Sequence, residues 1–307
     1  MKFPKGMSHY RVNGKYIPWS RLLEFEDSSS YLQNSDRIRE NFGKDGYLFF
    51  RDFIPKDFAN KAKNEIIQSL EEVGEVDGSY KHPISTGKSE RKSKVKDLGD
   101  FWKSVSEGEH LRSVTHGRYL SDLASRVRNK QCVAFDFVFL RIGVPGRFTH
   151  IHCDYPFFTR LTEEVVTIWI ALSDVPADLG PLYIIKGSDQ FEDHLSTTRG
   201  FDLMKQTDRQ ASILDHPAEY VEKRRAKLLT KEFLAGDVLL FNMFIQHGSF
   251  ENYSPKNQIR ITCDVRFQPD EDAKDPRYFG SNPTGTTGSG YGELNAAKPL
   301  DEPWHIR

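Results

Sequence analysis

Two histidines and one aspartate in this sequence have the residue types and the spacing of a metal site. His152 and Asp154 lie two residues apart, in the run from His150 to Asp154. Side chains two apart on a β-strand point to the same face, so we expect this imidazole and this carboxylate to reach into one space. His247, much later in the chain, would complete the set if a distant strand brought it alongside.

Such a set would occupy one face of the metal and leave three coordination positions open. This arrangement is the one used by non-heme Fe(II) oxygenases. Other interpretations stay open, because a histidine and an aspartate two residues apart occur by chance in many proteins. The same ligands could hold a zinc ion that activates water in a hydrolase. The chain could also be a non-catalytic jelly-roll protein that only binds a ligand.

The last predicted strand has one polar face, formed by Arg260, Thr262, Asp264 and Arg266. A polar face usually points to solvent. This strand follows His247 closely, however, so Arg260 would lie beside the metal if His247 points into a barrel. Its guanidinium would then offer a planar fork to a carboxylate. A metal with an arginine nearby suits a small dicarboxylate, with one end chelated and the other paired.

Short segments with period-two alternation follow one another in the second half of the chain. We predict strands over residues 131–140, over the histidine segment after the turn at 143–146, and over 165–172, 182–185, 238–241 and 259–267. Several strands at short spacing, bounded by glycine and proline, favour a double-sheet jelly roll over a βαβ fold. Trp169, on one of these strands, and Ser249, just after His247, could line the pocket of the dicarboxylate.

The other segments are expected to pack around this core as helix and loop. Residues 47–50 predict a short strand, residues 58–73 an amphipathic helix, residues 76–108 a loop, and the region around 110–128 a second helix. We therefore divide the chain into an N-terminal helical and loop region (1–130), a core (131–269) with a lid insertion at about 189–232, and a Gly/Pro-rich tail (270–307).

The charge balance of the chain argues against a nucleic-acid or membrane partner. The 307 residues include 43 basic and 44 acidic ones, and a net charge of −1 gives no global field to gather an anionic polymer or lipid surface. The three cysteines are scattered singly, which favours a reducing compartment. The sequence lacks a long apolar run, an N-terminal secretory signal and a C-terminal peroxisomal signal. We expect a cytoplasmic protein.

The sequence resembles the phytanoyl-CoA dioxygenase family of Fe(II)/2-oxoglutarate-dependent oxygenases over roughly residues 40–270. The resemblance rests on the following motifs, which come in the family's order: His152-Cys153-Asp154, Thr167-Ile168-Trp169-Ile170-Ala171-Leu172, Gly180-Pro181-Leu182, Gly187-Ser188, Gly236-Asp237-Val238, His247-Gly248-Ser249, Asn252 and Ile259-Arg260. The closing strand, Asp264 to Pro269, resembles a branch with many members in secondary metabolism.

The resemblance implies a mainly β fold with flanking helices around a double-stranded β-helix core, of the jelly-roll or cupin-like kind. It implies an iron site made by His152, Asp154 and His247. It also implies a 2-oxoglutarate site in which Arg260 pairs with the far carboxylate and Trp169, Ser249 and Thr167 line the pocket. With O2 as the second co-substrate, such an enzyme hydroxylates, desaturates or cyclises a small metabolite, here expected in specialised metabolism, and releases succinate and CO2.

Some positions bear on the outcome and on the substrate. Related halogenases carry a small residue where this chain has Asp154, so a carboxylate disfavours halogenation. Asp189 stands where family members usually have histidine, a departure outside the predicted ligands that would alter substrate access. Three residues are candidate substrate contacts: His150, Arg160 and Arg266. Either arginine could instead form an ordinary salt bridge. The substrate stays open, as does the choice between monomer and homodimer.

Overall fold

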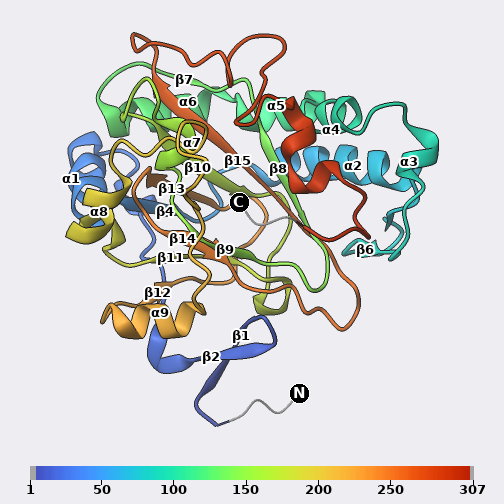
Figure 1. Cartoon of the computed structure of the whole chain (residues 1–307), viewed down its shortest axis with the longest axis horizontal. Helices are drawn as coiled ribbons and strands as arrows, with labels where there is room; N and C mark the ends of the chain where they lie inside the picture. Colours follow the sequence, from blue (N-terminus) through green and yellow to red (C-terminus); the bar gives the residue numbers. More distant parts are fainter. Residues whose placement is uncertain (1–4, 305–307) are drawn as a thin grey trace.

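The computed structural model describes residues 5–304. The first four and last three residues, on which the expectations about secretory and peroxisomal signals partly rest, lie outside the described residues. No helix in the described part of the chain is long and apolar enough to cross a membrane. Figure 1 shows β-strands at the centre of the molecule with helices and long loops around them.

The larger sheet has six strands, and its centre is formed by β10 and β15. In spatial order it contains β4 (Tyr47–Phe50), β13 (Val238–Asn242), β10 (Val166–Ala171), β15 (Arg260–Pro269) and β7 (Cys132–Ala134), and β8 (Phe139–Gly143) also pairs with β15. All of these pairings are antiparallel. Every residue of β10 and β15 is buried, including the polar face of β15, so this face does not point to solvent.

The smaller sheet has five strands and faces the larger one. In spatial order it contains β3 (Leu22–Leu23), β12 (Leu228–Leu229), β11 (Leu182–Ile185), β14 (His247–Ser249) and β9 (Thr149–His152). Apolar side chains from both sheets, among them Trp169, Ile184 and Phe241, form one buried cluster between them. The two sheets stay separate in their hydrogen bonding, which is the predicted two-sheet architecture without a closed barrel.

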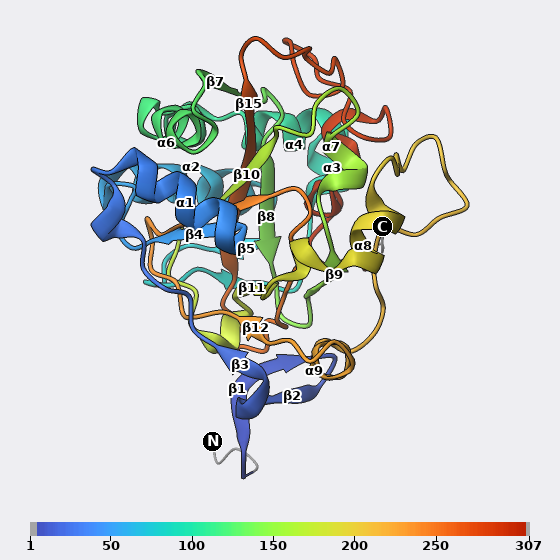
Figure 2. The ribbon, with the colours of Figure 1, turned by 90° about the vertical axis from the view of Figure 1, so that its left-hand side faces the viewer.

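Helices cover the outer face of the six-stranded sheet (Figure 2). They are α1 (Ser35–Asp45), α2 (Lys56–Glu72), α4 (Leu98–Ser106), α5 (Glu109–Thr115) and α6 (Arg118–Arg128). The stripe predicted for α2 is buried at Ala62, Ile66 and Leu70. These residues join α4, α5 and α6 and the outer side chains of the sheet in the largest apolar cluster of the molecule. The sheet is therefore supported from behind, so its inner face can carry polar groups.

Three predicted elements differ from the structure. Residues 131–140 are two strands, β7 and β8, because the N–H groups of Phe135 and Phe137 bond to the carbonyls of Arg266 and Tyr278. The predicted loop at 76–108 contains β5 (Val76–Asp77), β6 (Ile84–Ser85), α3 (Arg91–Lys94) and α4, where Trp102 is buried. The single helix predicted around 110–128 is α5 and α6, separated at His116 and Gly117.

Strands from outside the main run of predicted core strands also join the two sheets. Strand β4 lies within the segment 1–130 and forms the edge of the six-stranded sheet beside β13. The segment 189–232 contains α8 (Glu192–Thr198) and α9 (Pro217–Lys223), but it also supplies β12 to the five-stranded sheet. The first residues form a hairpin of β1 (Met7–Val12) and β2 (Lys15–Pro18). Each of these segments is thus part of one packed unit.

A buried ion pair fixes the C-terminal tail to the helical side of the molecule. Arg91 donates one side of its guanidinium to Glu75, and both side chains are fully buried. Its Nη1 donates to the carbonyl oxygens of Ala296, Ala297 and Lys298 at 2.7–2.9 Å. Because carbonyl groups in this loop would otherwise be buried without donors, Arg91 is what allows the tail to pack here.

Replacing Arg91 by methionine should destabilise the protein strongly. The substitution leaves the Glu75 carboxylate buried without its cation and three tail carbonyls without their donor, so we expect the free energy of unfolding to fall by about 3–5 kcal/mol. Urea denaturation followed by circular dichroism measures this change. As a control, Arg118→Met removes a surface pair with Asp122, in which the Arg118 side chain is 92% exposed, and should change stability by no more than about 0.5 kcal/mol. Equal effects of the two substitutions would contradict the role given to Arg91.

Candidate metal centre

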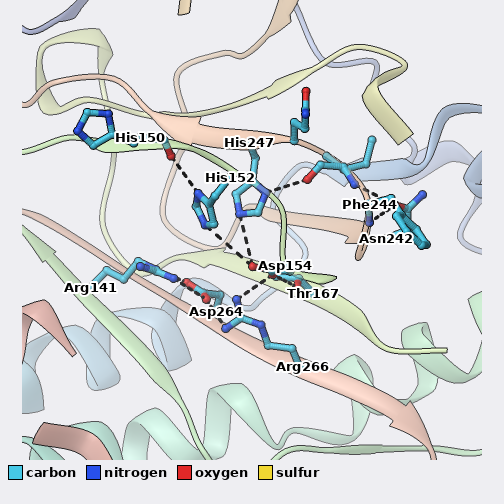
Figure 3. A network of polar contacts seen from close by, with 12 residues as sticks. Arg141, His150, His152, Asp154, Thr167, Asn242, Phe244, His247, Asp264 and Arg266 are labelled. Atoms are coloured by element: carbon cyan, nitrogen blue, oxygen red, sulfur yellow. Dashed lines mark hydrogen bonds and ion pairs between the residues drawn. The ribbon is translucent and has the colours of Figure 1, made fainter. Parts of the chain in front are cut away.

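Antiparallel pairing of β9 with β14 brings the two predicted histidine ligands together. His152 lies directly opposite His247 in the register of these strands. Asp154 follows β9 and has a helical backbone conformation, φ −82° and ψ −15°, at the start of α7 (Tyr155–Phe158). The strand alternation from which we predicted a shared face therefore ends before Asp154. The turn into α7 is what directs its carboxylate toward the histidines (Figure 3).

The three donor groups point at one another. Nε2 of His152 lies 4.0 Å from Oδ1 of Asp154, and Nε2 of His247 lies 3.8 Å from the same oxygen. One donor atom from each residue lies within 4.8 Å of the other two, so a single ion could contact all three. Two imidazole nitrogens and one carboxylate oxygen suit a divalent transition metal.

Backbone carbonyls orient both imidazoles. Nδ1 of His152 lies 2.9 Å from the carbonyl oxygen of His150, and Nδ1 of His247 lies 3.1 Å from that of Ile245. A carbonyl oxygen only accepts, so each Nδ1 carries the proton and each Nε2 presents a lone pair. Burial, together with the neighbouring His247, lowers the pKa of His152 to about 3, and burial also lowers the pKa of His247. Both rings are therefore neutral, as metal ligands must be.

The second oxygen of Asp154 is held by the protein. Oδ2 accepts a hydrogen bond from the Thr167 hydroxyl and another, at 2.9 Å, from Nη2 of Arg266. Burial opposes ionisation of Asp154, but the charge of Arg266 and the hydrogen bond from the Thr167 hydroxyl hold its pKa below the usual range. Only Oδ1 is turned toward the histidines, so the carboxylate offers one oxygen to a metal.

Arg266, which we predicted as a substrate contact, supports a predicted metal ligand. Besides Asp154 its guanidinium donates to Asp264, and the side chain is 1% exposed. The guanidinium lies between the rings of Phe139 and Phe158, at 4.3 and 4.1 Å from their centroids. Two carboxylates and two rings thus surround Arg266, but Arg266 also lines a cavity of about 290 Å³ and its Nε has no hydrogen-bond partner within the described residues, so its contact with a substrate stays a prediction.

Arg141 is a site residue that the sequence prediction missed. It lies on β8 opposite Thr262 and forms a two-pronged pair with Asp264, the carboxylate that also holds Arg266. Figure 3 shows the resulting row of alternating charges, from Arg141 through Asp264 and Arg266 to Asp154. The signal in the sequence was an arginine within an otherwise apolar strand, a position where a buried charge needs a partner.

Arg260 lies in a narrow pocket that reaches the metal group. The pocket is lined by Arg141, Thr149, His152, Thr167, Trp169, Leu182, Phe241, His247, Gly248, Ser249, Arg260 and Asp264. The Arg260 guanidinium donates to the Gly180 carbonyl, and its Nη2 lies 3.5 Å from Oγ of Ser249. Burial and the charge of Arg141 lower the pKa of Arg260 to about 10. Within residues 5–304 no carboxylate forms an ion pair with Arg260, because Asp264, the carboxylate among the lining residues, is paired with Arg141 and Arg266.

A second, larger cavity of about 290 Å³ adjoins this pocket and shares Arg141, Thr149 and His152 with it. His150 lines it with its imidazole turned away from the three donor atoms (Figure 3). Arg160 is not among the lining residues; it forms a two-pronged pair with Asp202, which is the ordinary salt bridge considered above. Asp189 also lies outside both cavities, where it accepts a hydrogen bond from Asn242.

Removing the Thr167 hydroxyl should weaken metal binding without breaking the site. Thr167→Val deletes one hydrogen bond to Oδ2 of Asp154 and leaves Arg266 in place, so the carboxylate stays paired but is less firmly oriented. We expect the affinity for Fe(II) or Ni(II), measured by calorimetry, to fall about tenfold. Thr262→Val is the matched control, because the buried Thr262 hydroxyl has no hydrogen-bond partner within the described residues. A loss of affinity in the control as large as in Thr167→Val would rule out this role.

Comparisons with known proteins agree with this geometry. The family model for phytanoyl-CoA dioxygenase (PhyH) matches residues 42–262. No curated protein matches the sequence significantly. Among solved structures, SnoK, a non-heme α-ketoglutarate-dependent carbocyclase from nogalamycin biosynthesis, has a TM-score of 0.54 at 17% identity, over 82% of this chain and 90% of SnoK.

Two further structures are similar over comparable lengths. The epimerase SnoN in complex with Fe3+, α-ketoglutarate and nogalamycin RO has a TM-score of 0.54 at 15% identity, over 90% of this chain and 96% of SnoN. EctD from S. alaskensis with 2-oxoglutarate and 5-hydroxyectoine has a TM-score of 0.51 at 15% identity, over 80% of each chain. These likenesses confirm the double-stranded β-helix fold. With its family model matched over most of its length, this chain belongs to the phytanoyl-CoA dioxygenase family.

Proposed function

We propose that this protein is an Fe(II)- and 2-oxoglutarate-dependent oxygenase that oxidises a C–H bond of a small metabolite in specialised metabolism. The observation that carries the proposal is the joint presence of a metal-binding group and an unpaired buried arginine in one pocket. A dicarboxylate that reaches from a metal to Arg260 would use both features. Family membership and the 2-oxoglutarate-bound structures of SnoN and EctD support the same interpretation.

Each group of the site has a distinct task in this proposal. His152, His247 and Oδ1 of Asp154 would hold Fe(II), whose bound form supplies the redox chemistry that consumes O2 and 2-oxoglutarate. Arg260 would pair with the far carboxylate of 2-oxoglutarate, with Ser249, Thr167 and Trp169 around its carbon chain. The walls of the pocket would keep water away from the reacting groups. Oxidation of a C–H bond is the common starting point of hydroxylation, desaturation, cyclisation and epimerisation. The carboxylate of Asp154 disfavours halogenation.

The arrangement argues against the two alternatives. A zinc hydrolase would use the same three ligands to activate water, but it would have no use for a buried arginine in a pocket beside the metal. A non-catalytic binding protein would be free to lose the donor set, whereas here all three donors converge and both imidazoles present their free nitrogen. The pocket of Arg260 therefore favours a co-substrate that bears a second carboxylate.

Anaerobic titration with Fe(II) and 2-oxoglutarate tests the proposed chemistry directly. We expect the wild-type protein to develop the visible absorption band of the iron–2-oxoglutarate chelate, and Asp154→Ala and His247→Ala to lose most of it because a ligand is missing. Circular dichroism checks that these variants fold. A wild-type protein that binds Fe(II) but shows no band on addition of 2-oxoglutarate would count against the oxygenase and in favour of the hydrolase.

Truncation of Arg260 should weaken the binding of 2-oxoglutarate, and the loss should depend on the far carboxylate of that ligand. We expect Arg260→Ala to reduce the binding free energy of 2-oxoglutarate by about 2–5 kcal/mol, the usual effect of removing one partner of a buried charge pair. The control ligand is 2-oxopentanoate, which keeps the chelating end and lacks the second carboxylate, and its affinity should change little. The prediction is wrong if both ligands lose affinity equally, since Arg260 would then support the pocket and not the carboxylate.

A further inference from the structure

The larger cavity lies where a substrate would approach the proposed iron, and its walls come from four separated parts of the chain. These parts are residues 139–158, Ser212, Arg266 and residues 294–304. About 290 Å³ is close to the lower end of pockets that hold small molecules, roughly 300–1,000 Å³. A coenzyme A thioester is larger than this cavity, whereas a compact ring system fits.

The charges around this cavity do not balance. Arg141 and Arg266 are paired with Asp264 and Asp154, but Arg147 has no carboxylate partner within residues 5–304. Its guanidinium donates to the backbone carbonyl of Glu302, while the Glu302 carboxylate is turned to Lys92. Asp154 is the one carboxylate among the described lining residues, and both of its oxygens are committed.

Burial makes the unpaired charge of Arg147 more significant. Its side chain is half-buried, and desolvation lowers the pKa of Arg147, the mark of a cation removed from water without an anion beside it. A bound Fe(II) ion and Arg260 would together add three positive charges near this cavity, and the dicarboxylate co-substrate would offset two of them. The space that remains for a substrate therefore keeps one uncompensated positive charge at the Arg147 side, and it would favour an anionic guest.

Aromatic rings lie beside that charge. The guanidinium of Arg147 is 5.5 Å from the ring centroid of Trp304, and Phe148 contacts His150 edge-on at 4.9 Å. The faces of Phe139 and Phe158 are partly covered by Arg266, but Phe157 adds a further ring near His152. Flat apolar walls of this kind favour stacked or edge-on contact with a planar ring over contact with a flexible chain.

We propose that the substrate is a planar aromatic molecule carrying an anionic group, with Arg147 paired to that group and Trp304 against the ring. This inference rests on the proposed function, because it places the substrate beside the iron and 2-oxoglutarate sites. Arg147 is then a specificity-determining residue, at some distance from the reacting atoms. Arg91 holds the tail at Ala296 and Ala297, and Arg147 itself contacts the tail again at the Glu302 carbonyl and the Trp304 ring.

Matched probe molecules test this proposal on the whole protein loaded with Ni(II) and saturating 2-oxoglutarate. The probes are 2-naphthoate, its uncharged isostere 2-naphthamide, and decanoate, which has the charge without the ring. Isothermal titration calorimetry gives their dissociation constants. We expect the wild type to bind 2-naphthoate at least tenfold more tightly than either of the other two probes. Only 2-naphthoate can both pair with Arg147 and contact the aromatic walls with a planar ring.

Two variants separate the charge contact from the ring contact. Arg147→Gln should weaken the binding of 2-naphthoate at least tenfold and leave the affinity for 2-naphthamide within twofold of the wild-type value. The unchanged affinity for 2-naphthamide also shows that the cavity remains intact. Trp304→Leu should weaken 2-naphthoate and 2-naphthamide by the same factor. Arg118→Gln, which removes one positive charge from the exposed surface of α6, should change none of the affinities.

Several outcomes would overturn the inference. The first is equal binding of 2-naphthoate and 2-naphthamide by the wild type, and the second is an unchanged affinity of Arg147→Gln for 2-naphthoate. The third is displacement of 2-naphthoate by 2-oxoglutarate, which would place the probe on Arg260. As controls, the probes are titrated in the absence of 2-oxoglutarate, and 2-oxoglutarate is titrated in the absence of a probe. Normal 2-oxoglutarate binding without a preference for 2-naphthoate defeats the substrate inference alone, whereas absence of 2-oxoglutarate binding defeats the proposed function.

Discussion

The site depends on the hydrogen bond and ion pair that Arg266 makes with Oδ2 of Asp154. A carboxylate buried among apolar strands would take up a proton or turn outward unless a cation and donors satisfied it. Arg266 itself is fully buried and needs anions in turn, which Asp154 and Asp264 supply. Asp264 is shared with Arg141, whose side chain reaches the edge of the cavity. The row of charges is therefore stable as a whole, and no member could remain buried alone.

Two sheets with different tasks make this arrangement possible. The six-stranded sheet carries Arg141, Asp264 and Arg266 on its inner face and an apolar layer with helices on its outer face. The five-stranded sheet carries the histidines on adjacent strands, with their rings oriented by backbone carbonyls. The metal donors thus come from β14, from β9 and from the turn that follows β9, while Thr167 and Arg266 of the six-stranded sheet hold the Asp154 carboxylate. The position of this carboxylate relative to the imidazoles therefore depends on how the sheets pack, through clusters such as the one around Trp169 and Phe241.

Residue types and periodicity predicted much of the architecture and the metal group. Strands β10, β11, β13 and β15 were predictable because each alternates or forms a short apolar run between turn residues, and the family motifs link them in order. The position of Asp154 was predicted for an incomplete reason, since its side chain is aimed by the turn into α7 and not by strand alternation.

Which arginine would face a carboxylate and which would face open space could not be predicted, because this depends on pairings between β8, β15 and loops far apart in the sequence. For that reason Arg141 was missed, and the pairing of Arg266 with Asp154 and Asp264 was not foreseen. The tail was expected to be loop, but its contacts with Arg91 could not be foreseen from a glycine-rich sequence.

The anchoring of the cavity's outer wall has a consequence for how such enzymes can diversify. The wall formed by Leu294, Asn295, Ala296 and Trp304 is attached to Arg91 and Glu75, on the helical side of the molecule. None of the three metal donors contacts this attachment. Substitutions in this wall can therefore change the shape of the substrate cavity while the metal-binding residues stay unchanged. Because the metal centre and the cavity wall are separate in this way, one ancestral fold can give rise to enzymes with different substrate specificities.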